Sequence, residues 1–101
     1  MLRTLLSAAA AVMMTLTMAS AQESEIPDMI QGDADAKVEI IEYASYTCPH
    51  CASFHAGPYK DLKKDYIETG KVKFIYREVY FDRFGLWASM IARCAGPDRF
   101  F

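Results

Sequence analysis

The chain has 101 residues, of which 52 % are hydrophobic and 24 % are charged, and its formal net charge is −2. This length allows at most one small domain. A mildly acidic chain without a basic run argues against a role in nucleic-acid binding.

The first 21 residues have the three-part layout of a secretory signal peptide. Arg3 stands near the amino terminus, the run from Leu5 to Met18 is uncharged and largely apolar, and Ala19-Ser20-Ala21 forms a small-residue cleavage site. The apolar run is too short to cross a membrane comfortably, and no basic cluster follows it, so a membrane anchor is the weaker interpretation. We expect cleavage after Ala21 and export to the periplasm, an oxidising compartment in which disulfides persist.

The mature chain is expected to open with an arm and then form one β-α-β unit. Residues 22–36 are polar and acidic, and we interpret them as an N-terminal arm with a turn. Residues 37–80 would form the β-α-β unit, with strands over 37–45 and 71–80 running parallel. The first strand is apolar on both faces, as expected of a central strand that is covered on both sides.

A helical segment lies between these two strands. Apolar residues recur at helical spacing from Ala52 to Thr69, and charged residues fill the opposite face. Gly57-Pro58 falls inside this stretch, so we expect a kink or a break near Ala56. Gly70 is expected to end the helix as a C-cap residue.

Residues 81–101 are expected to begin a further helical segment. Asp82 is a candidate N-cap, and the helix should end at Gly96-Pro97. Its apolar positions are Phe84, Trp87, Ala88, Ile91 and Ala95. We expect the two aromatic residues of this helix to belong to the core, and the last two residues of the chain, Phe100 and Phe101, to be exposed.

Two cysteines, Cys48 and Cys51, stand where the first strand meets the helix that follows it. Only a thiolate attacks a disulfide, and the first turn of a helix stabilises an anion through free N–H groups and the peptide dipoles. Cys48 is therefore the expected nucleophile, and Cys51, one turn further on the same face, is its resolving partner. Pro49 suits the first helical position, and His50 adds a donor, or a positive charge, beside the Cys48 sulfur.

A structural disulfide between these two cysteines would close almost no loop and would stabilise the fold little. The catalytic interpretation is therefore favoured. Cys94 is either a buried spare thiol or the partner of a cysteine beyond Phe101, and the odd cysteine count favours the second.

Glu42 lies on the first strand, six residues before Cys48. A buried carboxylate is costly unless it is neutral or paired, so Glu42 is expected to have either a functional or a structural role on this strand. Two interpretations stay open: Glu42 relays a proton to or from Cys51, or it forms an ordinary ion pair with a cation such as Arg77. His55 could also lie near the site, but a solvated or packing histidine is the stronger expectation.

The segment from Glu42 to Cys51, at a strand-to-helix junction after a signal peptide, resembles the DsbA family of thiol:disulfide oxidoreductases. Its Pro-His pair separates it from the Gly-Pro pair of thioredoxin and the Gly-His pair of disulfide isomerases. The resemblance, which runs from Gly32 to Gly96, implies an α/β structure: a thioredoxin fold with a helical insertion, here truncated after the first helix of the insertion. The remainder of a full member, including the cis-proline loop that helps hold the substrate peptide, is missing, so the chain is expected to be poorly stable.

The resemblance implies a periplasmic enzyme that forms disulfides in exported proteins, with Glu42 under the Cys48–Cys51 pair. Its partners would be reduced exported proteins and a DsbB-like membrane protein that reoxidises the pair. A monomer is expected, and neither a cofactor nor a metal. The alternatives are a reductase or isomerase with the same site, and a copper- or zinc-binding protein that uses both cysteines with His50 and His55. The tight first turn argues against one metal binding all three ligands of the motif.

Overall fold

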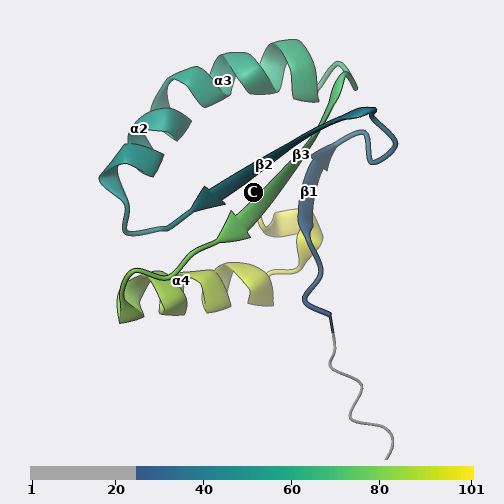
Figure 1. Cartoon of the computed structure of the whole chain (residues 1–101). Helices are drawn as coiled ribbons and strands as arrows, with labels where there is room; N and C mark the ends of the chain where they lie inside the picture. Colours follow the sequence, from purple (N-terminus) through teal and green to yellow (C-terminus); the bar gives the residue numbers. More distant parts are fainter. Residues whose placement is uncertain (1–24) are drawn as a thin grey trace, which may run out of the picture.

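The computed structural model describes residues 25–101, and the predicted signal peptide and its cleavage site lie outside this range. The elements in chain order are β1 (Met29–Gly32), β2 (Val38–Ala44), α2 (Pro49–Ala56), α3 (Pro58–Leu62), η2 (Lys63–Ile67), β3 (Val72–Glu78), α4 (Arg83–Cys94) and η3 (Pro97–Arg99). The sheet lies between α2 and α3 on one side and α4 on the other (Figure 1). Within residues 25–101 no helix has the length and apolar character needed to cross a membrane.

The three strands form one mixed sheet in the order β1-β3-β2. β2 and β3 are parallel, with Ile40 opposite Phe74, which confirms the predicted β-α-β unit. β1 pairs antiparallel with β3, with Met29 opposite Tyr76. β3 is therefore the central strand of the described sheet, and β2 is an edge strand. Within the described sheet, the strand predicted over 37–45 therefore has a neighbour on one side only.

The two strands differ in burial in the way their positions require. Val38 and Tyr43 of β2 are 54 % and 61 % exposed, whereas Phe74 and Ile75 of β3 are almost completely buried. A strand loses its exposed edges only when it has a neighbour on each side, as β3 has. The apolar pattern of β2 therefore indicated a strand correctly but did not determine its place in the sheet.

The predicted N-terminal arm contains the short strand β1. Met29 is buried in the core, and Gly32, with a φ of 87°, ends the strand where a Cβ would lie 2.6 Å from the carbonyl oxygen of Val72. Only glycine tolerates both the positive φ and this close approach. The predicted turn follows, with the Ala36 N–H donating to the Asp33 carbonyl at 3.1 Å. The polar residues on both sides of this four-residue strand concealed it in the sequence.

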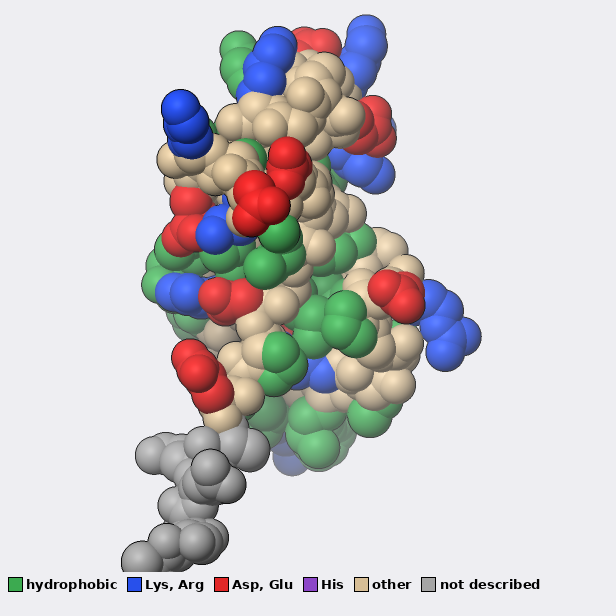
Figure 2. Space-filling view, turned by 90° about the vertical axis from the view of Figure 1, so that its right-hand side faces the viewer, with side chains coloured by type: hydrophobic (Ala, Val, Ile, Leu, Met, Phe, Trp, Pro, Cys, Tyr) green, Lys and Arg blue, Asp and Glu red, His purple; other side chains and the backbone are tan. Residues whose placement is uncertain are grey.

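The helical segment breaks where Gly57-Pro58 predicts. α2 ends at Ala56, Gly57 adopts a φ of −126° and a ψ of −96°, and α3 begins at Pro58. The chain then continues as the π-helical turn η2, and Gly70, with a φ of 72°, lies at the predicted end of the segment. Figure 2 shows basic and acidic side chains around the end of the molecule where α3 and η2 lie, in agreement with the charged helix face seen in the sequence.

The core lies between the sheet and the helices. Its buried members are Met29, Ala44, Ile67, Phe74, Tyr76 and Phe100. Phe100 is only 8 % exposed, and its ring centroid lies 5.6 Å from that of Tyr76. The expectation that the last two residues are both exposed was therefore wrong for Phe100 and is met by Phe101.

Helix α4 begins as predicted but presents a different face to the core. The Asp82 carboxylate accepts hydrogen bonds from the backbone N–H groups of Phe84 and Gly85, at 2.8 and 2.9 Å. The buried positions of the helix are the small residues Gly85 and Ser89. Phe84 and Trp87 are more than half exposed, so their predicted place in the core was wrong. Gly85 lies close to Ser45 and Thr47 in the loop after β2, and the large aromatic residues of the helix are turned outward.

Candidate active site

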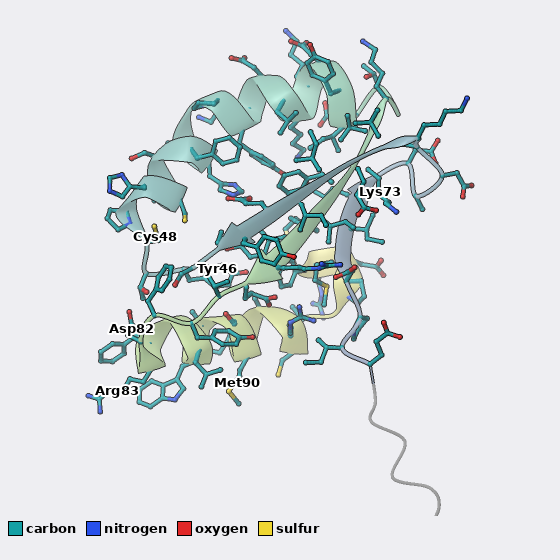
Figure 3. The ribbon with its side chains drawn as sticks, in the orientation of Figure 1. Tyr46, Cys48, Lys73, Asp82, Arg83 and Met90 are labelled. Atoms are coloured by element: carbon teal, nitrogen blue, oxygen red, sulfur yellow. The ribbon has the colours of Figure 1, made fainter. Side chains whose placement is uncertain are left out.

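Cys48 occupies the N-cap position of α2, and Pro49 is the first helical residue, as predicted. The Cys48 backbone is extended, with a φ of −88° and a ψ of 115°. The thiol therefore stands at the end of the helix where the N–H groups of the first turn have no helical partner. Figure 3 shows Cys48 at the start of α2, with Asp82, at the start of α4, across the connecting loop.

Hydrogen bonds hold the pKa of the Cys48 thiol below its ordinary value. The largest contribution is the bond from the Cys51 thiol, followed by the backbone N–H of Cys51, and the backbone N–H of His50 adds to it. Each of these bonds favours the thiolate over the thiol. The contribution of His50 here comes from its backbone, while its side chain is exposed.

The pKa of the Cys51 thiol is raised. The hydrogen bond to Cys48 contributes most, burial and the negative charges of Cys48 and Glu42 also raise it, and the backbone N–H of Ser45 acts in the opposite direction. The same contact between the two sulfurs therefore favours a thiolate at Cys48 and a thiol at Cys51. Both cysteines are partly buried, and their sulfurs are not joined in this structure.

A hydrogen-bonded loop fixes the position of Cys48 relative to α4. Thr47 Oγ1 donates to Asp82 Oδ2 at 2.7 Å, and Ser45 Oγ lies 3.0 Å from Thr47 Oγ1. Because the Thr47 hydroxyl proton is used on Asp82, Ser45 is the donor in the second bond. The Cys48 N–H donates to the Ser45 carbonyl at 3.1 Å. The cap of α4 and the turn before Cys48 are thus one hydrogen-bonded network.

Glu42 pairs with His55 and not with Arg77. His55 Nε2 lies 2.8 Å from Glu42 Oε2 and 3.1 Å from Oε1. Arg77 instead donates to both carboxylate oxygens of Asp28 at 2.8 Å and to the Tyr43 hydroxyl. The ion pair expected between Glu42 and Arg77 was therefore wrong, because the β2 side chain at this position faces α2 while Arg77 reaches the segment before β1.

His55 is the residue that the sequence interpretation underrated. It is partly buried and lines a pocket of about 260 Å³ together with Cys48 and Cys51. The signal was present, since His55 follows Cys51 by four residues, which places both on one face of a helix. What the sequence lacked was the partner, since Glu42 lies on another element.

The pocket beside the two cysteines is mostly apolar. Its other lining residues are Ser45, Tyr46, Ala52, Tyr76, Phe100 and Phe101. A larger cleft of about 710 Å³ lies elsewhere, but ion-paired residues such as Asp28, Arg77 and Arg93 line it, and none of the cysteines does. The smaller pocket is therefore the one that borders both Cys48 and Cys51.

Two other features predicted from the sequence are a metal site and the state of Cys94. Within residues 25–101 no three His, Cys, Asp or Glu side chains are grouped so that they could hold a metal ion, so the geometry gives the copper or zinc alternative no support. Cys94, the last residue of α4, is exposed and free. The suggestion that it is a buried spare thiol was wrong.

Comparisons with known proteins agree with this geometry. Residues 24–101 match the family model described as thioredoxin. A relative from Rickettsia bellii, which carries the provisional name protein-disulfide oxidoreductase, is 44 % identical over 69 residues, which make up 68 % of this chain and 27 % of the relative. The chain thus spans only about a quarter of the length of this curated relative.

Two crystal structures have similar folds. The alpha-DsbA1 protein of Wolbachia pipientis is 40 % identical with a TM-score of 0.71, and the match covers 75 % of this chain and 39 % of that one. A protein-disulfide isomerase from Novosphingobium aromaticivorans is 32 % identical with a TM-score of 0.70, and the match covers 73 % of this chain and 38 % of that one. On the fold, the site and these matches, the chain belongs to the thioredoxin family as a DsbA-like member.

Proposed function

We propose that this chain carries the redox centre of a periplasmic protein-disulfide oxidoreductase that forms disulfides in exported proteins. The observation that carries the proposal is that the pKa values of two adjacent thiols are shifted in opposite directions, with that of Cys48 lowered and that of Cys51 raised. A stabilised thiolate favours the reduced form of the pair, so the oxidised pair is a good oxidant. The predicted signal peptide over residues 1–21 supports the location.

The reaction proceeds through a mixed disulfide. A substrate thiolate attacks Cys48 Sγ, the Cys48–Cys51 bond breaks, and its electron pair goes to Cys51 Sγ, which takes up a proton. A second substrate thiolate then attacks the substrate sulfur of the mixed disulfide, and Cys48 leaves as a thiolate. The substrate loses two electrons, which the cysteine pair takes up, and two protons, of which one is balanced by the proton on Cys51 and the other goes to solvent. The lowered pKa of Cys48 makes it the better leaving group in the second step.

The remaining motif residues support these two steps. Pro49 starts the helix without adding a competing N–H donor, and His50 supplies its backbone N–H and, when protonated, a positive charge near the thiolate. Glu42 lies close enough to influence Cys51 and acts as its proton relay. A DsbB-like membrane protein would accept the electrons from the reduced pair, and the protein would act as a monomer without a cofactor.

Disulfide isomerisation or reduction is the second candidate, because one of the similar structures is a protein-disulfide isomerase. The same two sulfurs would serve either reaction, and the direction depends on the reduction potential of the pair. Equilibration of the chain with glutathione buffers of known ratio measures this potential. A potential above that of the glutathione couple supports the oxidase, and one well below it supports the reductase.

Oxidation of a reduced two-cysteine peptide by the oxidised chain tests the proposal directly. We expect both the Cys48→Ser and the Cys51→Ser variants to lose this activity, because neither can form the Cys48–Cys51 disulfide that accepts the two electrons of the peptide. Cys94→Ser is the matched control, because it removes an exposed thiol outside the pocket, and it should oxidise the peptide at the parent rate. Equal rates for the parent and Cys48→Ser would remove Cys48 from the mechanism.

A further inference from the structure

His55 and Glu42 form a pair whose partners come from different elements, α2 and β2. One ring nitrogen, Nε2, reaches both carboxylate oxygens, at 2.8 and 3.1 Å. The Glu42 side chain is 13 % exposed and that of His55 is 33 % exposed. A carboxylate that is this shielded from water is far more sensitive to a neighbouring charge than a surface carboxylate.

Aromatic rings hold the imidazole in place. The His55 ring centroid lies 4.3 Å from that of Tyr59 and 6.1 Å from that of Tyr76. Besides these two tyrosines, from α3 and β3, the titratable residues Tyr46, Cys48 and Cys51 line the pocket beside the ring. Burial raises the pKa of both tyrosines, so both stay neutral. The charges that raise the pKa of the Cys51 thiol are those of Cys48 and Glu42.

The pair is linked to Cys51 on both sides. The negative charge of Glu42 raises the pKa of the Cys51 thiol, and His55 lines the same pocket as Cys51. His55 and Cys51 are one helical turn apart on α2. A positive charge on the imidazole therefore lies where it offsets the carboxylate charge that acts on Cys51.

We propose that His55 is a positioning residue that acts through Glu42, and that the charge on its ring sets how readily Cys51 gives up and takes back its proton. The inference rests on the proposed function, in which Cys51 gains a proton when the disulfide opens and loses it when the disulfide re-forms. A protonated ring cancels much of the carboxylate charge and eases formation of the Cys51 thiolate. An uncharged side chain at this position leaves the carboxylate charge in full effect.

The test isolates Cys51 in the chain that carries Cys48→Ala and Cys94→Ala, in which it is the sole thiol. The rate of its alkylation by iodoacetamide at pH 6 reports the fraction of thiolate. His55→Gln retains a hydrogen-bond donor without the charge, and we expect about threefold to tenfold slower alkylation. His55→Lys retains a positive charge and should restore most of the rate.

Variants at Glu42 show whether His55 acts through this carboxylate. Glu42→Gln removes the negative charge with little change of volume, and alkylation of Cys51 should become faster. Adding His55→Gln to Glu42→Gln should then change nothing further. Glu39→Gln is the matched control, because it makes the same substitution on the same strand. The Glu39 side chain is 41 % exposed and forms an ion pair with Lys73. Cys51 in this variant should be alkylated at the parent rate.

Several outcomes would overturn the inference. The first is an unchanged rate of Cys51 alkylation in His55→Gln. The second is that His55→Gln slows alkylation as much in the Glu42→Gln background as it does when Glu42 is present. Near-UV circular dichroism checks that each variant folds. If a variant does not fold, the coupling is tested by a further measurement that leaves both Glu42 and His55 unsubstituted. The ¹⁵N signal of His55 Nε2 should move when Cys51 is carboxamidomethylated, and an unmoved signal also contradicts the coupling. Alkylation needs no redox turnover, so failure of the proposed function would appear only in peptide oxidation.

Discussion

Replacement of Gly85 by alanine tests how tightly α4 packs against the loop that precedes Cys48. A Cβ at this position would lie 2.9 Å from Ser45 Oγ and 3.2 Å from Thr47 Oγ1. Ser45 is only 2 % exposed, and its hydroxyl is bonded to Thr47 at 3.0 Å. The serine oxygen can therefore move away only by breaking that bond or by shifting the loop.

The expected magnitude is the difference between two opposing effects. Alanine is more favourable than glycine inside a helix by about 1 kcal/mol. Overpacking of a well-packed site costs roughly 1–3 kcal/mol. Because the contact with Ser45 is closer than real Cβ contacts allow, we place the cost in the middle of this range and expect Gly85→Ala to lower the free energy of unfolding by about 1 kcal/mol.

Urea unfolding followed by circular dichroism measures this change, and alkylation of Cys48 measures its effect on the site. Displacement of the loop would also move the turn that holds Cys48, so its alkylation should slow. The matched control is Gly85→Ala combined with Ser45→Ala, which removes the oxygen at 2.9 Å. In the Ser45→Ala background the glycine substitution should cost much less. A Gly85→Ala chain that is as stable as the parent would refute the packing argument.

Three further predictions follow from single contacts. Cys51→Ala removes the largest cause of the lowered Cys48 pKa, so alkylation of Cys48 at pH 6 should slow, and an unchanged rate would contradict this cause. The bond from Arg77 lowers the pKa of Asp28, so its stabilisation is present above the ordinary aspartate pKa of about 3.9 and is lost as the pH falls through the lower folded value. Asp28→Asn should therefore flatten the stability profile of acid unfolding below about pH 4; a profile equal to the parent's would exclude this pair. Gly32→Ala should destabilise the chain strongly in thermal unfolding, because of its positive φ and the close carbonyl, and a chain of parent stability would show that β1 shifts without cost.

Local chemistry explains which parts of the fold could be predicted. The break at Gly57, the cap by Asp82 and the positive φ of Gly70 each depend on the backbone preferences of one or two residues. The parallel pair of strands follows from a strand, a helix and a strand in sequence. These features need no knowledge of distant neighbours.

Features that depend on distant partners were missed or misplaced. The pairing of β1 with β3 joins Met29 to Tyr76 across most of the described chain, and it decides that β3 is central. The same applies to the aromatic residues of α4, which are exposed because the buried positions of this helix are Gly85 and Ser89. Apolar character alone does not tell which of several apolar faces will find a partner.

The candidate site shows the same distinction between local and distant contributions. The sequence by itself determined the position of the candidate redox pair, because Cys48, Pro49 and Cys51 lie within one helical turn whose free N–H groups favour a thiolate. Only the tertiary structure decided what surrounds that pair: the contact of Glu42 with His55, and the tie from Thr47 to Asp82. The physical reason is that a helix terminus is built from neighbours in the chain. The Glu42 charge that acts on Cys51 comes from β2, and the Asp82 carboxylate that holds Thr47 comes from the start of α4, so packing alone brings both to the site.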